Sequence, residues 1–515
     1  MNNEVKSIKR SWFNNTILFL ATLIVFVFIL SAIGSLLKWD GNYLTLNPIT
    51  GVLENNLVSV ESLFSREGIR FIIGNAVSNF MNFAPLIMFL FIMIGIGFAE
   101  RTGLFNSMFG LTAKKISRFW LTFIVVFVSM IFNIIGDIGF MVIIPLSAIM
   151  FLINGRNPLI GIISSFVAMT AGYGINVIST QMDFLLTQST VIGANVIDKS
   201  YLVSNNGNLF FGIVCTILLS FIISYITEKV IVKRVGKYKK EDLTEELTIN
   251  KKEKKGLLAS LIAFIVLLII FIYILLPLGT PLSGILLDYE YVDFYSRVFS
   301  NNSYVIQGLS FMLFVTLLVC GWLYGIFART IKTKNQFSNY LYGSLNNIGG
   351  VLVLFFIVSQ LIALFKKSNL GTVFTSWIAE TLSNLNFSAM PLILLFFLLV
   401  ALVNIVQTSA ASKWAILAPV VVPLFMKSNI SPEFTQAIFR AGDSITNVIT
   451  PFFPYFVVFI GMIQLYNKNE EMIGIKDIYK LLLPYLLVIF FFWIIIFICW
   501  YIINLPIGIN VLPII

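Results

Sequence analysis

The feature that most constrains this chain is the recurrence of long apolar segments from Thr16 to Trp500, with a single long polar interruption. A helix needs roughly 20 apolar residues to cross about 30 Å of hydrocarbon, and a spanning segment must satisfy its own backbone hydrogen bonds. The composition agrees, because 58% of the 515 residues are hydrophobic and 11% are charged. We therefore expect an all-α integral membrane protein with no sizeable soluble domain.

The chain contains no histidine. This removes the commonest zinc ligand, the Ser-His-Asp type of triad and the usual proton shuttle at neutral pH. We therefore expect no catalytic residues, no firm metal site and no cofactor, and any proton chemistry must use carboxylates. The net charge is +10, but the basic residues gather in short loops beside the apolar segments, where membrane orientation explains them. We expect no nucleic-acid partner.

The apolar segments are of two kinds. Seven are uninterrupted, at 15–37, 71–98, 209–229, 257–278, 305–328, 341–366 and 479–503, and four are interrupted, at 119–153, 158–192, 385–427 and 432–465. Cytoplasmic loops carry an excess of Lys and Arg. Such residues gather near Lys6, around 101–118, in 229–255 and around 329–334, whereas the loops 38–70 and 279–304 are richer in acids. This predicts a cytoplasmic N-terminus and an external C-terminus.

Segment 119–153 has the pattern of a re-entrant hairpin. Its two apolar runs are each too short to span comfortably, and they flank the polar stretch 133–137. Both outer ends carry basic residues, Arg118 and Arg156, which places them on one side of the membrane. Segment 385–427 has the same two-armed form, so it predicts a second hairpin.

Segments 158–192 and 432–465 are expected to cross the membrane as broken helices. The first contains the string GYGIN at 172–176, where the glycines permit an unwound turn. The second contains the string GDS at 442–444, followed by two prolines.

The two halves of the chain follow the same order about 272 residues apart. Asn133 and Asn176 recur as Asn404 and Asn447, and the pair Pro145/Pro158 recurs as Pro419/Pro432. The charge bias makes helix 71–98 run inward and helix 341–366 run outward, so the repeats are expected to be inverted. The predicted fold is nine transmembrane helices plus two re-entrant helical hairpins in two inverted repeats.

The predicted divisions follow from this order. They are an N-terminal helix and external loop at 1–70, a first repeat at 71–229, a polar cytoplasmic linker at 230–256, two connecting helices at 257–340, a second repeat at 341–503 and a C-terminal tail at 504–515.

Ionisable side chains inside a bilayer are costly and therefore mark functional candidates. Arg440 and Asp443 are three residues apart on a helical segment, so they are expected to form a salt bridge. In the functional interpretation the guanidinium binds a substrate carboxylate and Asp443 holds it in place. In the alternative interpretation the pair is structural.

Asp183 is the candidate for ion coupling. It has no cation nearby in the sequence, and burial favours the protonated form of an isolated carboxyl. The alternative is that Asp183 is an acid of an external loop.

The two hairpin tips carry hard oxygen donors, which suit Na⁺ or a polar substrate. The first tip has Asn133 and Asp137, and the second has Asn404, Gln407, Thr408, Ser409 and Ser412. We expect ion or substrate contact at Asn133 and Asp137, with a Na⁺ site at Asn133 or Asn404 as an option. We also expect substrate contacts at Asn404, Ser409, Ser412, Asn176 and Asn447. The alternative is that these groups only satisfy the backbone of the tips.

Lys413 and Trp414 directly follow the second tip. The indole could stack on an aromatic substrate, with Lys413 or Arg440 near an anionic group. A packing tryptophan and a snorkelling lysine are the alternatives.

With these residues in hand, the chain resembles the AbgT family of transporters. Five strings carry the resemblance: NFAPLIMFLFIMIGIGFAERTGLF at 82–105, GDIGFMVIIPL at 136–146, GYGINVISTQMDFLL at 172–186, TSAASKWAILAPVVVPLF at 408–425 and FRAGDSITNVITPFFPYF at 439–456. The resemblance implies p-aminobenzoyl-glutamate uptake or export of sulphonamide-type antimetabolites, a bacterial plasma membrane location, and a homodimer.

The resemblance also implies roles for individual residues. Asp183 matches the family's essential aspartate and Trp414 its hairpin tryptophan, while Pro432, Arg440 and Asp443 match residues in or near the second broken helix. Asn133 and Asp137 match the first tip. Three positions depart from the family pattern: Phe132, Phe184 and Ala411.

Together these observations predict a proton-coupled secondary transporter of p-aminobenzoyl-glutamate or a related aromatic carboxylate, working by alternating access. Coupling is expected in the first half at Asp183, and substrate binding in the second half at Arg440, Lys413 and the polar tips. A Na⁺-coupled carboxylate transporter is the nearest alternative, ahead of a channel or an intramembrane enzyme with an Asp183–Asp443 dyad.

Overall fold

The computed structural model describes residues 14–46, 52–113, 116–236, 238, 249–300, 302–384, 387–467 and 473–515. Some residues used in the charge argument lie outside the described part. They are the basic residues near the N-terminus, Lys114, Lys115, and residues 237 and 239–248 of the expected linker. Within the described part, almost all regular structure is helical.

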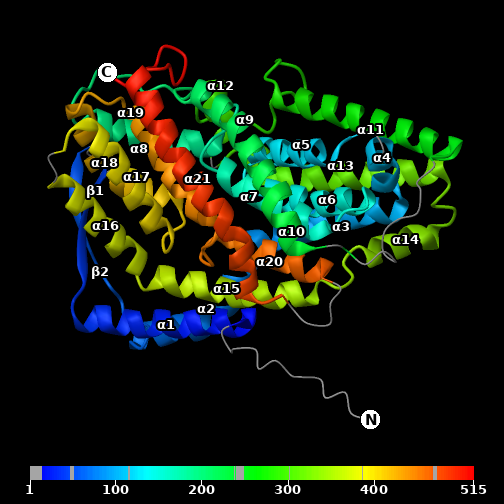
Figure 1. The fold of residues 1–515 in the computed structure, drawn as a ribbon, viewed down its shortest axis with the longest axis horizontal. Helices are drawn as coiled ribbons and strands as arrows, with labels where there is room; N and C mark the ends of the chain where they lie inside the picture. The colour runs from blue at the N-terminus through cyan, green and yellow to red at the C-terminus, as the bar shows by residue number, and fades with distance from the viewer. Residues whose placement is uncertain are drawn as a thin grey trace, which may run out of the picture.

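The N-terminal region adds one two-stranded sheet, which the sequence analysis did not predict, to an otherwise helical fold. It comprises α1 (Thr16–Leu36), β1 (Asp40–Leu46), β2 (Leu53–Ser59), α2 (Arg66–Met81), α3 (Ala84–Thr102) and α4 (Leu104–Ala113). The strands pair antiparallel from Asp40 opposite Ser59 to Leu46 opposite Leu53, and they lie at the left edge of Figure 1. The single helix expected at 71–98 is two helices, because Pro85 falls in the first turn of α3 and favours a helix start there.

The rest of the first half contains two helix pairs with irregular centres. Its elements are α5 (Arg118–Ile131), the 3₁₀ turn η2 (Phe132–Ile135), α6 (Ile138–Ile153), α7 (Pro158–Gly172), α8 (Gln181–Ala194), α9 (Leu209–Ile226), the π-helical turn η3 (Thr227–Ile231) and α10 (Val232–Val235). Gly136 ends η2 with φ of 63°, a left-handed conformation that glycine adopts without strain. The interruptions therefore fall where the sequence predicts them.

The second half also contains two helix pairs with irregular centres, and it follows four intervening helices. Those four are α11 (Lys251–Leu275), α12 (Phe294–Phe299), α13 (Tyr304–Ala328) and α14 (Lys334–Gly343). Then follow α15 (Gly349–Lys367), α16 (Leu370–Ser383), α17 (Ala389–Asn404), α18 (Ala410–Lys427), α19 (Pro432–Ile445), the 3₁₀ turn η5 (Thr446–Val448), α20 (Pro454–Tyr466) and α21 (Ile475–Ile503).

Nine helices of the described residues are long and apolar enough to cross a membrane. The number equals the prediction, but the membership differs. The nine include Arg118–Ile135 and Ala410–Lys427, which are arms of the two expected hairpins, and they leave out both halves of each expected broken helix.

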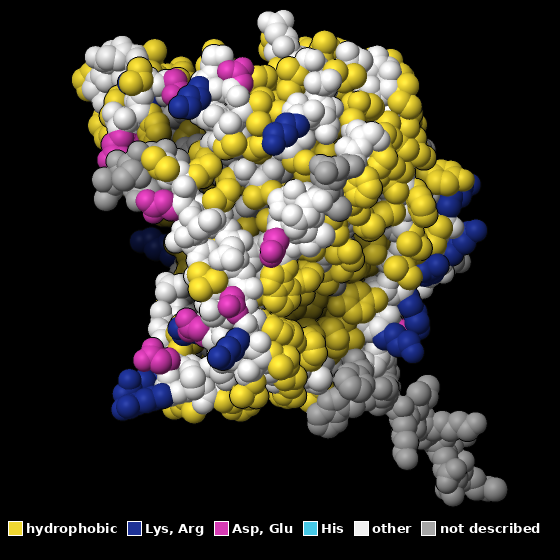
Figure 2. Space-filling model, turned by 90° about the vertical axis from the view of Figure 1, so that its left-hand side faces the viewer, with side chains coloured by type: hydrophobic (Ala, Val, Ile, Leu, Met, Phe, Trp, Pro, Cys, Tyr) yellow, Lys and Arg dark blue, Asp and Glu magenta, His cyan; other side chains and the backbone are white. Residues whose placement is uncertain are grey.

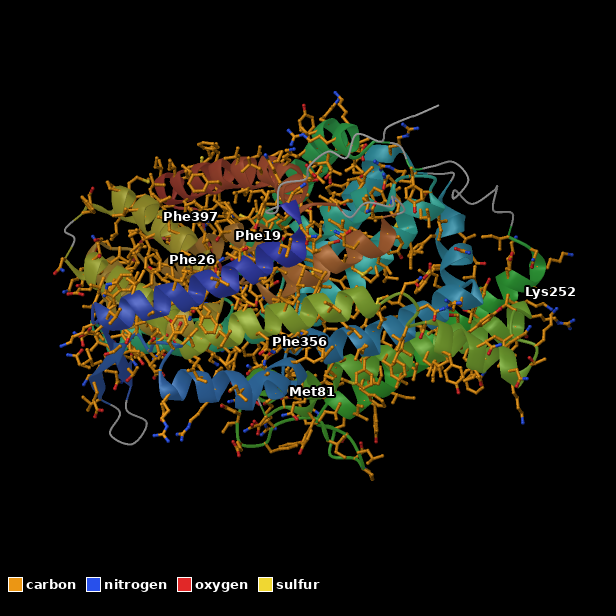
Figure 3. The ribbon with its side chains drawn as sticks, turned by 90° about the horizontal axis from the view of Figure 1, so that it is seen from below. Phe19, Phe26, Met81, Lys252, Phe356 and Phe397 are labelled. Atoms are coloured by element: carbon orange, nitrogen blue, oxygen red, sulfur yellow. The ribbon has the colours of Figure 1, made fainter. Side chains whose placement is uncertain are left out.

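Exposed apolar side chains cover the outer helices. Phe26 of α1, Met81 of α2 and Phe356 of α15 are all exposed, and Figure 3 shows these three helices running beside one another. Figure 2 shows a broad apolar surface on another face, with charged side chains mostly on its borders. Such large apolar surfaces fit contact with lipid.

The centre of the molecule is α19, which is buried along its whole length. It packs against α17, α18, α7 and α8, so helices of both halves surround it. Because its polar side chains cannot reach solvent, each needs a partner from a neighbouring helix. These partners define the candidate site.

Candidate functional site

The break between α7 and α8 (residues 173–180) lies directly against α19 and α9. Gly174 permits this contact, because a Cβ there would lie 2.5 Å from the carbonyl oxygen of Arg440. Gly212 of α9 does the same, since a Cβ there would overlap the carbonyl oxygen of Asn176. The unwound chain can therefore reach buried side chains of the second half.

Asp183 and Arg440 form a buried ion pair across the two halves. The Oδ1 atom of Asp183 accepts from Nη1 of Arg440, and Nη2 of the same arginine donates to the carbonyl oxygen of Tyr173 at 3.0 Å. The Oδ2 atom accepts from the backbone nitrogen and the hydroxyl of Thr180, both at 2.8 Å, which forms a capping box at the start of α8. Asp183 is thus a buried residue and not an acid of an exposed loop.

This pairing corrects the expected Arg440–Asp443 salt bridge. Both residues lie on α19, as predicted, but Asp443 pairs instead with Lys413 of α18. The ammonium of Lys413 also donates to Oδ1 of Asn404, and Lys413 is fully buried. Because Asp183 and Asp443 each hold a different cation, the pair does not form an aspartyl dyad.

Asn404 is the centre of a network at the second tip. Its Nδ2 atom faces the hydroxyl of Thr446 at 3.0 Å, Oδ1 of Asn447 at 2.8 Å and the carbonyl oxygen of Asp443. The Oδ1 atom of Asn404, where the sequence suggested a Na⁺ site, accepts from the ammonium of Lys413.

Trp414 packs inside the protein in this conformation. It is fully buried, its ring stacks on Phe439 at 4.4 Å, and its Nε1 donates to the hydroxyl of Thr190 at 2.8 Å. The same hydroxyl donates to Oε1 of Gln436 at 2.5 Å. The indole therefore ties α18 to α8 and α19, and it presents no free face to a substrate here.

The first tip lines a cavity of about 140 Å³. Asn133 donates from Nδ2 to the carbonyl oxygen of Met130 at 3.1 Å, and its buried Oδ1 has no partner among the described residues. Asp137 also lines this cavity, and the hydroxyls of Tyr173 and Tyr455 lie close to its carboxyl group.

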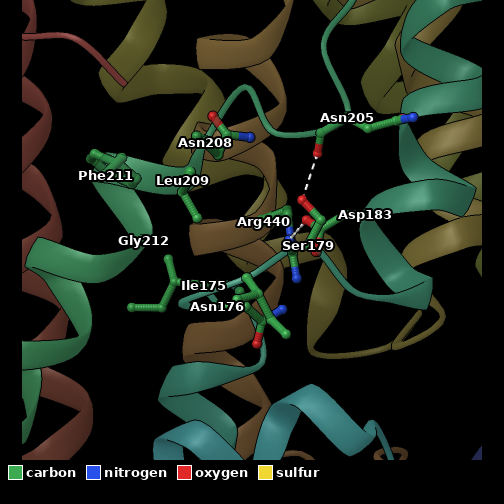
Figure 4. Close-up of a pocket in the computed structure, with 13 residues that line it drawn as sticks. Ile175, Asn176, Ser179, Asp183, Asn205, Asn208, Leu209, Phe211, Gly212 and Arg440 are labelled. Atoms are coloured by element: carbon green, nitrogen blue, oxygen red, sulfur yellow. Dashed lines mark hydrogen bonds and ion pairs between the residues drawn. The ribbon is translucent and has the colours of Figure 1, made fainter. Parts of the chain in front are cut away.

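A second, smaller cavity of about 20 Å³ lies on the other side of the break, with room for about one water molecule. Asn176, Asp183, Asn208 and Arg440 line it, as Figure 4 shows. The Oδ1 atoms of both asparagines are buried and have no partner among the described residues. Arg440 and Asn176 line both cavities, and Asp183 lines the smaller one.

The other predicted contacts lie apart from these cavities. Ser409 is exposed, caps α18 and lies 2.9 Å from the hydroxyl of Ser412. Pro432 occupies the first turn of α19 after the capping residue Ser431, so its place is structural. Neither serine nor Pro432 lines either cavity.

Two aromatic residues near the pair were missed by the sequence reasoning. The carbonyl oxygen of Tyr173 accepts from Arg440, and Tyr295 of α12 donates from its hydroxyl to the carbonyl oxygen of Thr180 at 2.9 Å. The ring of Tyr295 also packs against Phe184 at 6.0 Å. Tyr173 lies inside the recognised GYGIN string and could have been included, whereas nothing in the sequence links Tyr295 to Asp183.

No group of three or more His, Cys, Asp or Glu side chains that could hold a metal ion occurs in the described part of the chain. The cysteines Cys215, Cys320 and Cys499 are free.

Comparison with known proteins places the chain in a family. Residues 7–514 match a family model described as "AbgT putative transporter family". The "p-aminobenzoyl-glutamate transport protein" of Escherichia coli strain K12 is 27% identical over 491 residues, which are 95% of this chain and 92% of that protein.

Two solved structures are also similar. The YdaH transporter of Alcanivorax borkumensis is 29% identical and covers 96% of this chain and 99% of its own, with a TM-score of 0.48. MtrF of Neisseria gonorrhoeae, described as illuminating a class of antimetabolite efflux pumps, is 27% identical and covers 97% of this chain and 98% of its own, with a TM-score of 0.49.

The long apolar helices and the family match define a multi-pass membrane transporter. The chain belongs to the AbgT family.

Proposed function

We propose that this chain is a proton-coupled secondary transporter of p-aminobenzoyl-glutamate or a related aromatic carboxylate. The observation that carries the proposal is the buried Asp183–Arg440 pair, which joins the broken helix of the first half to α19 of the second half. Arg440 lines the cavities on both sides of the break, so one guanidinium is within reach of both.

The proposed coupling is an exchange of partners at Arg440. A guanidinium binds a carboxylate through charge-assisted hydrogen bonds. Here Nη1 of Arg440 binds Asp183, and Nη2 binds the carbonyl oxygen of Tyr173. Protonation of Asp183 removes its charge, and the carboxylate of a substrate then replaces it beside Arg440. A buried arginine without an anionic partner is costly, so the proton and the anionic substrate bind together. The coupled movement is therefore symport of a proton with the anion.

Alternating access requires the tips and broken helices to move. The cavity at the first tip, about 140 Å³, is smaller than the roughly 300 Å³ at which typical ligand pockets begin. A drug-sized substrate therefore needs the η2 tip to separate from α8 and α19. We propose that α5–α6 and α17–α18 are re-entrant hairpins in two inverted repeats. In the same proposal the chain is a homodimer in a bacterial inner membrane, with a cytoplasmic N-terminus and an external C-terminus.

One observation supports the Na⁺-coupled alternative. The Oδ1 atom of Asn133 is buried without a partner among the described residues, and it lines the same cavity as Asp137. An amide oxygen beside a carboxylate is a donor set that suits Na⁺. A Na⁺ site in this chain would therefore lie at the first tip.

Transport into proteoliposomes tests the proposal. Labelled p-aminobenzoyl-glutamate, and separately a sulphonamide, is offered under an imposed pH gradient or an imposed Na⁺ gradient. We expect the pH gradient to drive accumulation by the wild type, and Arg440→Ala to lose it. Arg70→Ala, which removes an exposed arginine of α2, is the matched control and should transport normally. Accumulation driven by Na⁺ alone would favour the alternative, and no movement under either gradient would reject the substrate class.

A further inference from the structure

The ammonium group of Lys413 lies between the second tip and α19, in surroundings that resemble a cation site. It contacts Oδ1 of Asp443 and Oδ1 of Asn404, and all three residues are buried. Fully buried lysines are rare in proteins. Lys413 also lies in the first turn of α18, where the helix dipole disfavours a cation. Its position therefore depends on the oxygens around it.

The orientation of Asn404 is fixed by its other contacts. Its Nδ2 atom faces three acceptor oxygens, which come from Asp443, Thr446 and Asn447. If the side-chain amide of Asn404 were flipped, its oxygen would face these acceptors instead of its nitrogen, which is unfavourable. The Oδ1 atom must therefore face Lys413. An amide oxygen and a carboxylate oxygen thus converge on one point.

Two helix ends support the same point. Asn404 is the last residue of α17, and Asp443 lies in the last turn of α19. The carboxyl ends of helices carry partial negative charge and stabilise cations. In transporters with broken helices, such ends together with unwound backbone bind coupling ions.

We infer that Asn404 and Asp443 form a monovalent-cation site that Lys413 fills with its own ammonium. A tethered ammonium supplies the charge that Na⁺ would supply, but it cannot leave during the transport cycle. The second tip therefore binds no coupling ion, and the chain does not use Na⁺ there. This deepens the proposed function by assigning coupling to the first half alone.

The test is to remove the tethered cation and offer a free one. Lys413→Ala removes the charge and leaves room, whereas Lys413→Met removes the charge and keeps the space filled. Purified full-length protein is compared in NaCl and in choline chloride of equal ionic strength, by thermal unfolding and by binding of ²²Na⁺. We expect Lys413→Ala to bind ²²Na⁺ saturably and to gain several degrees in Tm in NaCl. Lys413→Met should do neither.

The carboxylate supplies the control. Adding Asp443→Ala to Lys413→Ala should abolish the new response to Na⁺. If Lys413→Ala folds poorly, we expect monodisperse protein when it is purified in NaCl and aggregation when it is purified in choline chloride. Equal failure in both salts would overturn the inference, as would a Na⁺ response no larger than that of Lys413→Met. A wild-type Na⁺ response that Asp443→Ala removes would also overturn it. Because these measurements use no substrate and no pH gradient, their outcome is separate from that of the transport experiment.

Discussion

Four charged residues at the centre of the protein form two ion pairs that share one helix. Arg440 and Asp443 lie on α19, and each reaches a partner on another helix, Asp183 and Lys413 respectively. At this depth a charge is tolerated because its partner and further hydrogen bonds replace water. Each of these residues is therefore sensitive to loss of its partner.

Asp443→Asn should be much more harmful to stability than removal of both members of its pair. The single change leaves the buried ammonium of Lys413 without a counter-charge, so we expect the free energy of unfolding to fall by about 3–5 kcal/mol. The double variant Lys413→Met/Asp443→Asn, with both charges removed, should recover most of this loss. Chemical or thermal unfolding in detergent measures the cycle, and additive effects of the two single changes would contradict the pairing.

At this scale the sequence identifies the residues better than their partners. Asp183, Lys413, Arg440 and Asp443 were all candidates because charges inside apolar segments are conspicuous. The expected Arg440–Asp443 bridge was wrong because spacing along one helix shows only which side chains are neighbours on that helix. Contacts between residues about 250 positions apart depend on tertiary packing, which the sequence pattern does not show.

At the scale of elements, the interruptions are what bring the site together. The break between α7 and α8 was predicted from its glycines, and one of them, Gly174, permits the backbone contact with α19. The contact with α9 depends on Gly212 of α9, which the sequence pattern did not single out. The helices α12, α14 and α16 were not predicted as separate elements. They are short, and apolar content alone does not distinguish them from loops or from extensions of longer helices.

Gly174→Ala should damage the site. The new Cβ would lie 2.5 Å from the carbonyl oxygen of Arg440, so the break must move away from α19. We expect a loss of about 1–3 kcal/mol in stability and a larger loss of transport. Gly308→Ala in α13 is the matched control, because no atom lies within 4 Å of its new Cβ. It should be neutral or slightly stabilising, and equal effects of the two changes in unfolding and transport assays would contradict this account.

Asn208→Leu should affect coupling more than stability. Asn208 lines the cavity of about 20 Å³ beside Asp183, and a leucine there would remove one of the polar partners that a water molecule in the cavity needs. If water there delivers the proton, accumulation driven by a pH gradient should fall, while exchange of labelled for unlabelled substrate continues. Asn195→Leu, an exposed change at the end of α8, is the control. A fall in exchange equal to the fall in accumulation would contradict this role for the cavity.

For the whole molecule, hydrogen bonds between neighbouring helix ends and loops divide these ends into two groups. The hydroxyl of Thr330 donates to the carbonyl oxygen of Thr102 at 2.9 Å. Both residues lie at the end of the molecule whose loops are basic. At the other end, the backbone nitrogen of Phe211 donates to the carbonyl oxygen of Ile507 at 3.1 Å, and Ile430 pairs with Ile514. This end includes the C-terminal tail, labelled C in Figure 1. The grouping agrees with the alternation that charge bias predicts.

Cysteine labelling should place the two groups on opposite sides of the membrane. In a variant lacking the three native cysteines, we expect a cysteine at Asp198 or Tyr289 to react with an impermeant maleimide added to whole cells. A cysteine at Lys332 should react only after the cells are opened. Labelling of all three positions from the same side would contradict the proposed inverted topology.

The central claim is that Asp183 releases Arg440 to a substrate carboxylate when it takes up a proton. The most direct test is to measure proton uptake when p-aminobenzoyl-glutamate binds to purified protein in weak buffer. We predict that the wild type takes up about one proton for each substrate molecule that it binds. Its apparent affinity for the substrate should rise by at most about tenfold for each unit by which the pH falls. Asp183→Asn should bind substrate with no proton uptake and no such pH dependence. Substrate binding by the wild type without proton uptake, or unchanged uptake in Asp183→Asn, would contradict the account.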